Sequence, residues 1–253
     1  MLPLYLRALL PLLALAGGSA LGHVQWPSML LGGLFAAWLM LGSRRLPGWL
    51  WWGGTLVGSV TLAAHLLPGF QPMPLWPPRQ LSADAPPYAL RLSWDKLLLA
   101  MSLLAWWLGQ PTRPATQVRL AALAATLTII GVPLLALLLG VVAWQPKWPD
   151  GLWLWLAVNL GVTVLAEELL FRAWLQPALC RCLGNVWGVG ITALLFGAAH
   201  LPLSPPFALV AGLAGLGYGL VFLGSGRLWP ALLVHGAVNL LHLLLLSYPL
   251  RMV

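Results

Sequence analysis

Long apolar stretches, separated by short loops, constrain the fold of this chain more than any other feature. Residues 120–143 and 206–223 each run without a charged side chain. A helix of about 20 apolar residues is long enough to cross the hydrocarbon core of a bilayer. Charged residues make up 7% of the chain, against about a quarter in soluble domains, so a soluble fold could not cover its surface. Because the alternating pattern of membrane β-barrels is absent, the sequence predicts an all-α, polytopic bundle of transmembrane helices.

Nine apolar stretches are candidates for membrane spans, which predicts a bundle of about 8–9 spans. We expect them at residues 3–22, 28–43, 48–67, 96–109, 119–143, 152–175, 185–201, 206–223 and 229–247. Several are short for a core of about 30 Å, and the first two are also compatible with a helical hairpin. The first stretch resembles a signal peptide as well, but it lacks a clear small-x-small cleavage site, which favours an uncleaved span.

The positions of the basic residues favour an N-terminus on the inner side of the membrane. Short loops that carry Arg44, Arg45, Arg113 and Arg119 fall on the same side as the N-terminus, as the positive-inside rule requires. These loop residues also account for much of the net charge of +8, so we expect no nucleic-acid partner. The high Trp and Leu content and the compact loops are typical of bacterial proteins, which predicts a multi-pass protein of a bacterial inner membrane.

A proline-rich loop divides the chain. Residues 68–95 contain seven prolines, so they form neither a span nor a regular helix and act as a lid or, more simply, as a tether. We therefore expect three parts: residues 1–95 with spans 1–3 and this loop, residues 96–150 with spans 4–5, and residues 151–253 with spans 6–9 as the catalytic core.

The only two glutamates of the chain, Glu167 and Glu168, lie together inside the apolar stretch 152–175. A charged side chain within a span costs several kcal/mol unless it is paired or hydrated. Arg172 follows Glu168 by four residues, which places both on one face of an α-helix and predicts an ion pair. Glu167 is rotated about 100° away, so it remains available for other chemistry.

Two further pairs with helical spacing follow in the last third of the chain. Phe196 and His200 are four residues apart, and so are His235 and Asn239, with His242 nearly on the same face. With the glutamates, these helices offer a carboxylate, imidazoles and an amide, which are the groups that activate water and stabilise an oxyanion. Taken singly, each is also explained by hydrogen bonds between helices, and that reading is favoured for His242.

The helical rise per residue places these groups at different depths in the membrane. With straight helices, His200 lies about 28 Å from the level of Arg181, whereas His235 lies only about 12 Å from the level of Arg227. A bend near Pro177 and a new helix after Gly184 reduce the difference without removing it.

In this order along the chain, the three motifs resemble those of the CAAX protease and bacteriocin-processing family. This family, also called CPBP or Abi, contains glutamic-type intramembrane endopeptidases. The resemblance rests on "EELLFR", "ALLFGAAH" and "GRLWPALLVHGAVN" and covers about residues 152–247; the first five stretches carry no motif of the family.

The resemblance implies a role for each matching residue. It implies that Glu167 activates water with the help of His200, and that His235 and Asn239 stabilise the oxyanion. The supporting residues it implies are Glu168, Arg172 and Phe196. It also implies hydrolysis of a peptide bond in a membrane-associated protein or peptide, without a metal or other cofactor.

Two alternative functions stay open. The same residues could bind zinc in a metal-dependent protease, although the chain lacks the His-Glu-x-x-His pair. Paired ionisable residues within spans are also typical of transporters. The second alternative is therefore a non-catalytic protein, either a transporter or a membrane scaffold that binds without cleaving. The sequence leaves the oligomeric state undetermined, and it does not choose between a prenylated CAAX end, a bacteriocin leader and a C-terminal sorting tail as the substrate.

Overall fold

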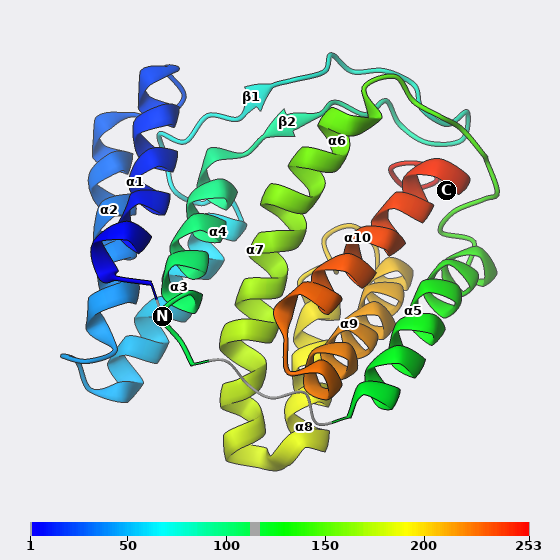
Figure 1. Ribbon diagram of the computed structural model, residues 1–253. Helices are drawn as coiled ribbons and strands as arrows, with labels where there is room; N and C mark the ends of the chain where they lie inside the picture. Colours follow the sequence, from blue (N-terminus) through cyan, green and yellow to red (C-terminus); the bar gives the residue numbers. More distant parts are fainter. Residues whose placement is uncertain (1, 112–116, 253) are drawn as a thin grey trace. The chain divides into compact units, whose positions relative to one another are not determined.

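The computed structural model of the chain describes residues 2–111 and 117–252, so Arg113 lies outside the described residues. Every apolar stretch predicted from the sequence forms helix there, which confirms the all-α prediction (Figure 1). The first five helices are α1 (Leu4–Ala20), α2 (Trp26–Gly42), α3 (Gly48–Ala63), α4 (Trp94–Trp107) and α5 (Val118–Leu138). A continuous helical run then contains α6 (Leu152–Val158), η1 (Asn159–Val164), α7 (Leu165–Glu168), η2 (Leu169–Leu175) and α8 (Gln176–Ala198). The last two helices are α9 (Pro205–Ser225) and α10 (Leu228–Leu245).

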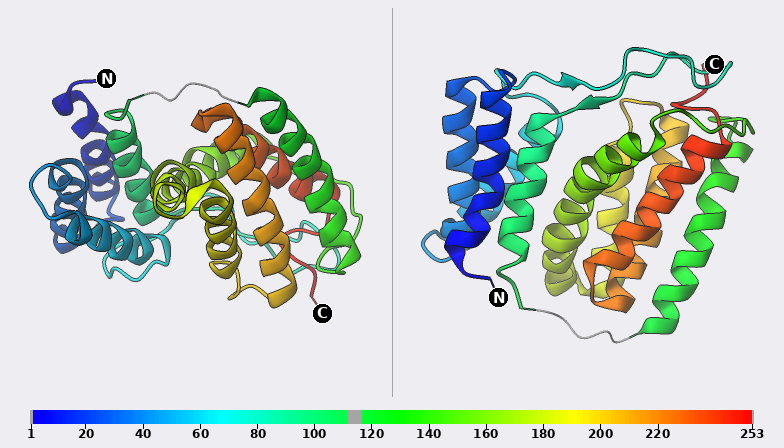
Figure 2. Two further views of the ribbon diagram at one scale, coloured as in Figure 1. Left: turned by 90° about the horizontal axis from the view of Figure 1, so that it is seen from below. Right: turned by 45° about the horizontal axis from the view of Figure 1, so that its top comes forward.

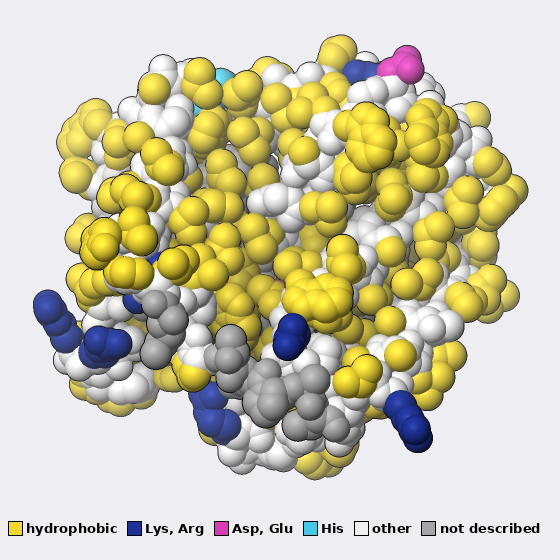
Figure 3. Space-filling model, viewed as in Figure 1, with side chains coloured by type: hydrophobic (Ala, Val, Ile, Leu, Met, Phe, Trp, Pro, Cys, Tyr) yellow, Lys and Arg dark blue, Asp and Glu magenta, His cyan; other side chains and the backbone are white. Residues whose placement is uncertain are grey.

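Four of these helical segments are long and apolar enough to cross a membrane. They are Val118–Leu138, Leu152–Ala198, Pro205–Ser225 and Leu228–Leu245, and two shorter apolar helices are Leu4–Ala20 and Trp26–Gly42. Hydrophobic side chains dominate the face drawn in Figure 3, where charged side chains are few. The chain therefore has the character of a multi-pass membrane protein, whereas 8–9 spans and an inside N-terminus stay predictions.

The chain forms two compact units, which we describe separately. The first unit contains Met1–Leu75, Arg91–Pro111 and Gly161–Leu170. In this unit α4 packs against α1, α2, α3 and the short helix α7. Buried leucines of α4 contribute to the core of this unit. Asp95, at the start of α4, is buried as well and lies 2.7 Å from the imidazole of His65.

The second unit contains Trp76–Leu90, Thr112–Leu160 and Phe171–Val253. Helix α9 is central to it and packs against α5, α8 and α10, and the views of Figure 2 show α5, α9 and α10 side by side. Glycines permit this close packing: a Cβ atom added to Gly197 of α8 would lie 2.8 Å from the carbonyl oxygen of Ala208 in α9. Small residues that bring helix backbones together are typical of membrane proteins.

The predicted break between residues 175 and 185 lies at Gly184. This residue has φ 81° and ψ 165°, far from helical values, although helical hydrogen bonding continues on both sides. Only glycine adopts this backbone conformation readily. A Cβ atom on Gly188 would lie 2.5 Å from the backbone nitrogen of Cys180, so the chain turns back here and α8 consists of two arms (Figure 1).

The proline-rich loop is more ordered than a simple tether. In the first unit, strands β1 (Met73–Pro74) and β2 (Arg91–Leu92) pair antiparallel. In the second unit, Arg79 and Tyr88 form a further antiparallel bridge. The prolines limit the pairing to these short pieces because each one lacks a backbone donor. The domain boundaries placed at residues 95 and 150 stay a prediction.

Candidate active site

A small cavity in the second unit brings together three of the six polar site residues predicted from the sequence, His200, His235 and Asn239. Its volume is about 70 Å³, and α5, α8, α9 and α10 contribute to its wall. The polar or aromatic groups that line it are Phe196, His200, Phe207, Tyr218, His235, Asn239 and His242. A water molecule occupies about 10–15 Å³ by the same measure, so the cavity has room for a few waters.

His235 is held in the wall by aromatic rings. Its side chain is buried and stacks on Tyr218, with ring centroids 4.4 Å apart and planes inclined by 16°. The ring of Phe196 meets it edge-on at 5.9 Å. These contacts fix the plane of the imidazole, so its ring nitrogens have a defined direction at the cavity.

His200 follows the end of α8, and one hydrogen bond defines its tautomer. Its Nδ1 atom lies 2.8 Å from the carbonyl oxygen of Phe196. A carbonyl oxygen can only accept, so Nδ1 carries the hydrogen, and Nε2 of the neutral ring is then a proton acceptor. The His200 ring also lies 4.9 Å from the Phe196 ring. Phe196 therefore links the two histidines, although a count of helical rise placed them at different depths.

Asn239 lies one helical turn after His235 and also lines the cavity. Its Nδ2 atom donates a hydrogen bond to Oδ1 of Asn159, at 3.2 Å. The amide nitrogen carries two hydrogens, so one remains for a second acceptor. Sequence reasoning missed Asn159, whose only signal was its polarity within the apolar stretch 152–175.

Arg172 is fully buried against the rings of Phe196 and Tyr218. Its guanidinium lies 4.5 Å from the centre of the Phe196 ring and 5.3 Å from that of Tyr218. Its Nη2 atom donates to the carbonyl oxygen of Gly215, at 3.1 Å. The cation thus contacts two rings that in turn contact His235, whereas the supporting role of Arg172 and Phe196 in catalysis stays a prediction.

Gln176 is a second residue that sequence reasoning missed. It lies four residues after Arg172, is buried, and donates from Nε2 to the carbonyl oxygen of Gly219, at 2.9 Å. Gly215 and Gly219 are also four residues apart, so two side chains of the long helical run bind two successive turns of α9. A polar residue next to Pro177 gave no clear signal for this contact.

The two glutamates lie in an unusual stretch of helix. Glu168 is fully buried and Glu167 is half-buried in the short helix α7, and the neighbouring segments η1 and η2 are π-helical. π-Helical turns are rare and occur frequently at functional sites. The sequence predicts one regular α-helix over 152–175, whereas Asn159–Val164 and Leu169–Leu175 are π-helical, with wider winding. The glutamates belong to the first unit, so their pairing with Arg172 and their distances to the histidines stay predictions.

Comparison with known proteins gives one match. Residues 149–241 match the family model described as type II CAAX prenyl endopeptidase Rce1-like. Residues 149–241 are thus similar to this family, and we call this part of the chain the Rce1-like domain. No curated protein and no solved structure matches the chain.

The Rce1-like domain contains all three motifs that carried the resemblance in the sequence. It includes Glu167, His200, His235 and Asn239, and it ends shortly before His242. His242 also lines the cavity, but its Nε2 atom donates to the carbonyl oxygen of Ser247, at 2.9 Å. This hydrogen bond runs to the segment that follows α10 and not to another helix, so the interhelical bond favoured for His242 stays a prediction.

Within residues 2–111 and 117–252, no three His, Cys, Asp or Glu side chains converge in a way that could hold a metal ion. The polar side chains in the wall of the cavity are the imidazoles of His200, His235 and His242, the phenol of Tyr218 and the amide of Asn239. The wall of the cavity thus includes the His200 ring, whose Nε2 atom can accept a proton, and the Asn239 amide, which can donate a hydrogen bond.

Proposed function

We propose that this protein is an intramembrane endopeptidase that hydrolyses a peptide bond of a membrane-associated protein or peptide. The observation that carries the proposal is the cavity of the Rce1-like domain, where His200, His235 and Asn239 lie together. Its family model describes CAAX prenyl endopeptidases. A water-sized cavity among apolar helices is the environment that peptide hydrolysis within a bilayer requires.

In the proposed mechanism, Glu167 is the general base and His200 assists it. A water molecule loses a proton to this pair and its oxygen attacks the carbonyl carbon of the substrate. The tautomer of His200 supports this role, because the hydrogen bond from Nδ1 to Phe196 leaves Nε2 to accept. The same pair then returns the proton to the nitrogen of the leaving amine as the carbon–nitrogen bond breaks.

His235 and Asn239 are the proposed oxyanion stabilisers. The tetrahedral intermediate carries a negative oxygen, which needs hydrogen-bond donors that are already oriented. The Tyr218 stack fixes the His235 ring, and the hydrogen bond to Asn159 holds the Asn239 amide. Loss of one donor of this kind typically costs about 10²–10³-fold in kcat.

We propose that the substrate is a peptide or protein anchored in a bacterial inner membrane. A bacteriocin leader, a C-terminal sorting tail and a prenylated CAAX end are the three substrate classes that fit the family. Bacterial cells contain few prenylated CAAX proteins, so the first two are preferred.

The experiment that tests the proposal compares proteomes and purified protein. Membranes from a strain with the wild-type chain and from a strain with Glu167→Gln are searched for peptides that accumulate only in the variant. Cleavage of each candidate substrate in proteoliposomes is then compared between the wild type and the variants Glu167→Gln, His200→Ala and Asn239→Ala, with Cys182→Ser as the matched control. The proposal requires cleavage by the wild type and the control and its loss in the other variants; unchanged cleavage in Glu167→Gln contradicts it.

A metal-dependent mechanism makes a different prediction for the same assay. Strong chelation would abolish cleavage, and elemental analysis of the purified protein would find bound zinc. The mechanism proposed here requires cleavage that persists after chelation.

A further inference from the structure

The segment that follows α10 contributes to the wall of the cavity at its first residue. We call residues 246–252 the lid. Leu246 lines the cavity together with His242, the last histidine of α10. The bond from His242 to the carbonyl oxygen of Ser247 ties the start of the lid to the helix. The lid is therefore part of the cavity wall.

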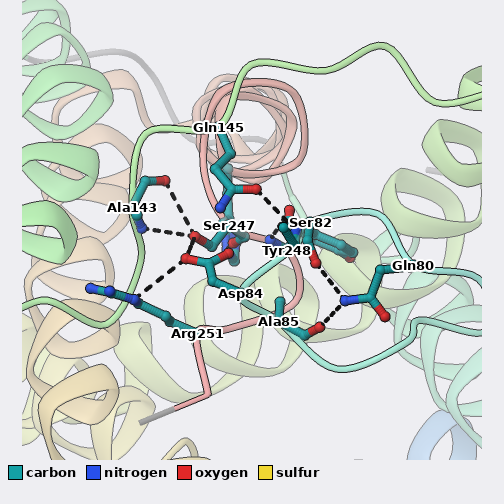
Figure 4. Close-up of polar contacts among 11 residues, drawn as sticks. Gln80, Ser82, Asp84, Ala85, Ala143, Gln145, Ser247, Tyr248 and Arg251 are labelled. Atoms are coloured by element: carbon teal, nitrogen blue, oxygen red, sulfur yellow. Dashed lines mark hydrogen bonds and ion pairs between the residues drawn. The ribbon is translucent and has the colours of Figure 1, made fainter.

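One carboxylate, that of Asp84, holds the lid from the proline-rich loop (Figure 4). The hydroxyl of Ser247 donates to Oδ2 of Asp84, at 2.7 Å, and Nε of Arg251 lies 3.4 Å from the same oxygen. The backbone nitrogen of Met252 donates to the carbonyl oxygen of Asp84, at 2.8 Å. Asp84 thus contacts the lid at Ser247, Arg251 and Met252.

Further hydrogen bonds hold the lid against the segment between α5 and α6 and against Ser82 of the proline-rich loop. The nitrogen of Ser247 donates to the carbonyl oxygen of Ala143, at 2.9 Å, and the nitrogen of Ala143 donates to the Ser247 hydroxyl, at 2.9 Å. The nitrogen of Tyr248 donates to the hydroxyl of Ser82, at 2.9 Å. Ser247 is fully buried and takes part in most of these contacts, so it is the central residue of the closed lid.

The size of the cavity requires that some part of its wall moves. A volume of about 70 Å³ holds a few waters and no peptide. The helices around it are locked by close contacts: a Cβ atom on Gly224 of α9 would lie 2.7 Å from the carbonyl oxygen of Gln117, and the α8–α9 contact at Gly197 is equally close. The lid lacks such glycine contacts: hydrogen bonds hold it, together with the contacts of the Tyr248 ring with Tyr88, Trp155 and His242, and Arg251 and Met252 are exposed. A segment with an exposed end opens locally at lower free energy than packed helices.

We propose that Asp84 is a positioning residue for the reaction, because it latches residues 246–252 as a lid that must open to admit the substrate. Asp84 acts through Ser247 and does not touch the substrate. When the hydrogen bond from the Ser247 hydroxyl to Asp84 breaks, the lid separates from the loop. The chain between His242 and Ser247 then acts as the hinge. This inference rests on the proposed function, so its test includes a measurement that does not need cleavage.

The first test measures amide hydrogen exchange of the lid in the full chain in proteoliposomes. Asp84→Ala removes both side-chain contacts, so exchange of residues 246–252 is expected to accelerate about tenfold or more. Asp84→Asn keeps an oxygen that accepts from Ser247 and should restore most of the protection. Arg251→Gln loses only the partly exposed ion pair and serves as the matched control with a smaller effect. Exchange at the wild-type rate in Asp84→Ala overturns the latch.

The second test locks the lid. Because the side chains of Asp84 and Ser247 are in contact, the double variant D84C/S247C can form a disulfide across the latch. The oxidised form, with its disulfide verified by mass spectrometry, should lose at least tenfold in cleavage, and reduction should restore it. The single variants D84C and S247C, oxidised in the same way, control for the native cysteines. Equal cleavage by the locked and reduced forms overturns the lid, whereas absence of cleavage in every form, wild type included, overturns the proposed function and leaves the exchange result to decide on the latch.

Discussion

The imidazole of His235 stacks on the ring of Tyr218, with centroids 4.4 Å apart and planes 16° from parallel. Tyr218 belongs to α9 and His235 to α10, so the packing of these two helices sets the orientation of a proposed oxyanion donor. An aromatic pair of this kind contributes about 0.5–1.5 kcal/mol beyond the area that it buries.

Replacement of Tyr218 tests whether the stack matters for catalysis. Tyr218→Phe keeps the ring, so cleavage should stay close to that of the wild type. Tyr218→Ala removes it and should lower kcat about 2–10-fold, with little change in KM, because the orientation of His235 matters most in the transition state. Steady-state kinetics in proteoliposomes give both values. An equal loss in both variants would mean that the phenol hydroxyl, rather than the stack, is required.

Replacement of Asn159 tests the partner of Asn239. Asn159→Ala removes the acceptor at 3.2 Å that holds the amide. A hydrogen bond of this kind contributes about 0.5–1.5 kcal/mol, so kcat should fall roughly 2–10-fold. The double variant with Asn239→Ala should be no worse than Asn239→Ala alone, because the two residues act as one unit. Additive losses in this double-mutant cycle would contradict the pairing.

Because the guanidinium of Arg172 is buried, Arg172→Lys should lower the free energy of unfolding more than Gln176→Met does. Arg172→Lys keeps the charge, but it loses the planar group over Phe196 and the bond to Gly215. A desolvated cation–π contact is worth about 2 kcal/mol, so the free energy of unfolding should drop by at least that amount. Gln176→Met, which removes only a neutral hydrogen bond to α9, is the matched control with a smaller loss. Thermal unfolding in detergent measures both, and an unchanged Arg172→Lys would contradict this account.

Stability at alkaline pH depends on tyrosines outside the helices. Burial raises the pKa of Tyr88 above its ordinary value of 10.0, and burial raises the pKa of Tyr248 well above it. Because the folded chain holds both phenols neutral, their contribution to stability is complete below pH 10 and is lost as the pH rises above it. Burial lowers the pKa of Lys147 below its ordinary value of 10.5. Between the lowered pKa and 10.5 this lysine makes stability rise with pH, which is opposite in sign to the effect of the tyrosines.

The measurement is the thermal unfolding temperature of the wild type and Tyr88→Phe from about pH 9 to about pH 11. The wild type should lose more stability over this range than the variant, which lacks one of the two phenols. Parallel curves would contradict the assignment to Tyr88.

The sequence predicts the helices well because apolar backbone within a membrane must satisfy its own hydrogen bonds. It also predicts the break near Gly184, since a glycine between two apolar stretches permits a turn. It does not predict the π-helical winding around Glu167 and Glu168, because no side chain in that stretch differs in kind from those of an α-helix.

The residues of the candidate site could also be predicted only in part. Spacing of four residues identifies His235 with Asn239 and Phe196 with His200, since both pairs lie on single helices. The partners of these residues come from other helices, as Asn159 and Tyr218 do, and no local pattern connects positions so far apart. The contact of Asp84 with Ser247 joins residues 163 positions apart, so only the folded chain reveals it.

The central claim is that Glu167 activates the hydrolytic water in the cavity with His200. The measurement that tests it most directly is single-turnover cleavage of an identified substrate by Glu167→Gln in proteoliposomes, with unfolding temperature measured on the same sample. The account predicts an unfolding temperature close to that of the wild type and a cleavage rate reduced at least about 10²-fold. A folded Glu167→Gln protein that cleaves at the wild-type rate would contradict it.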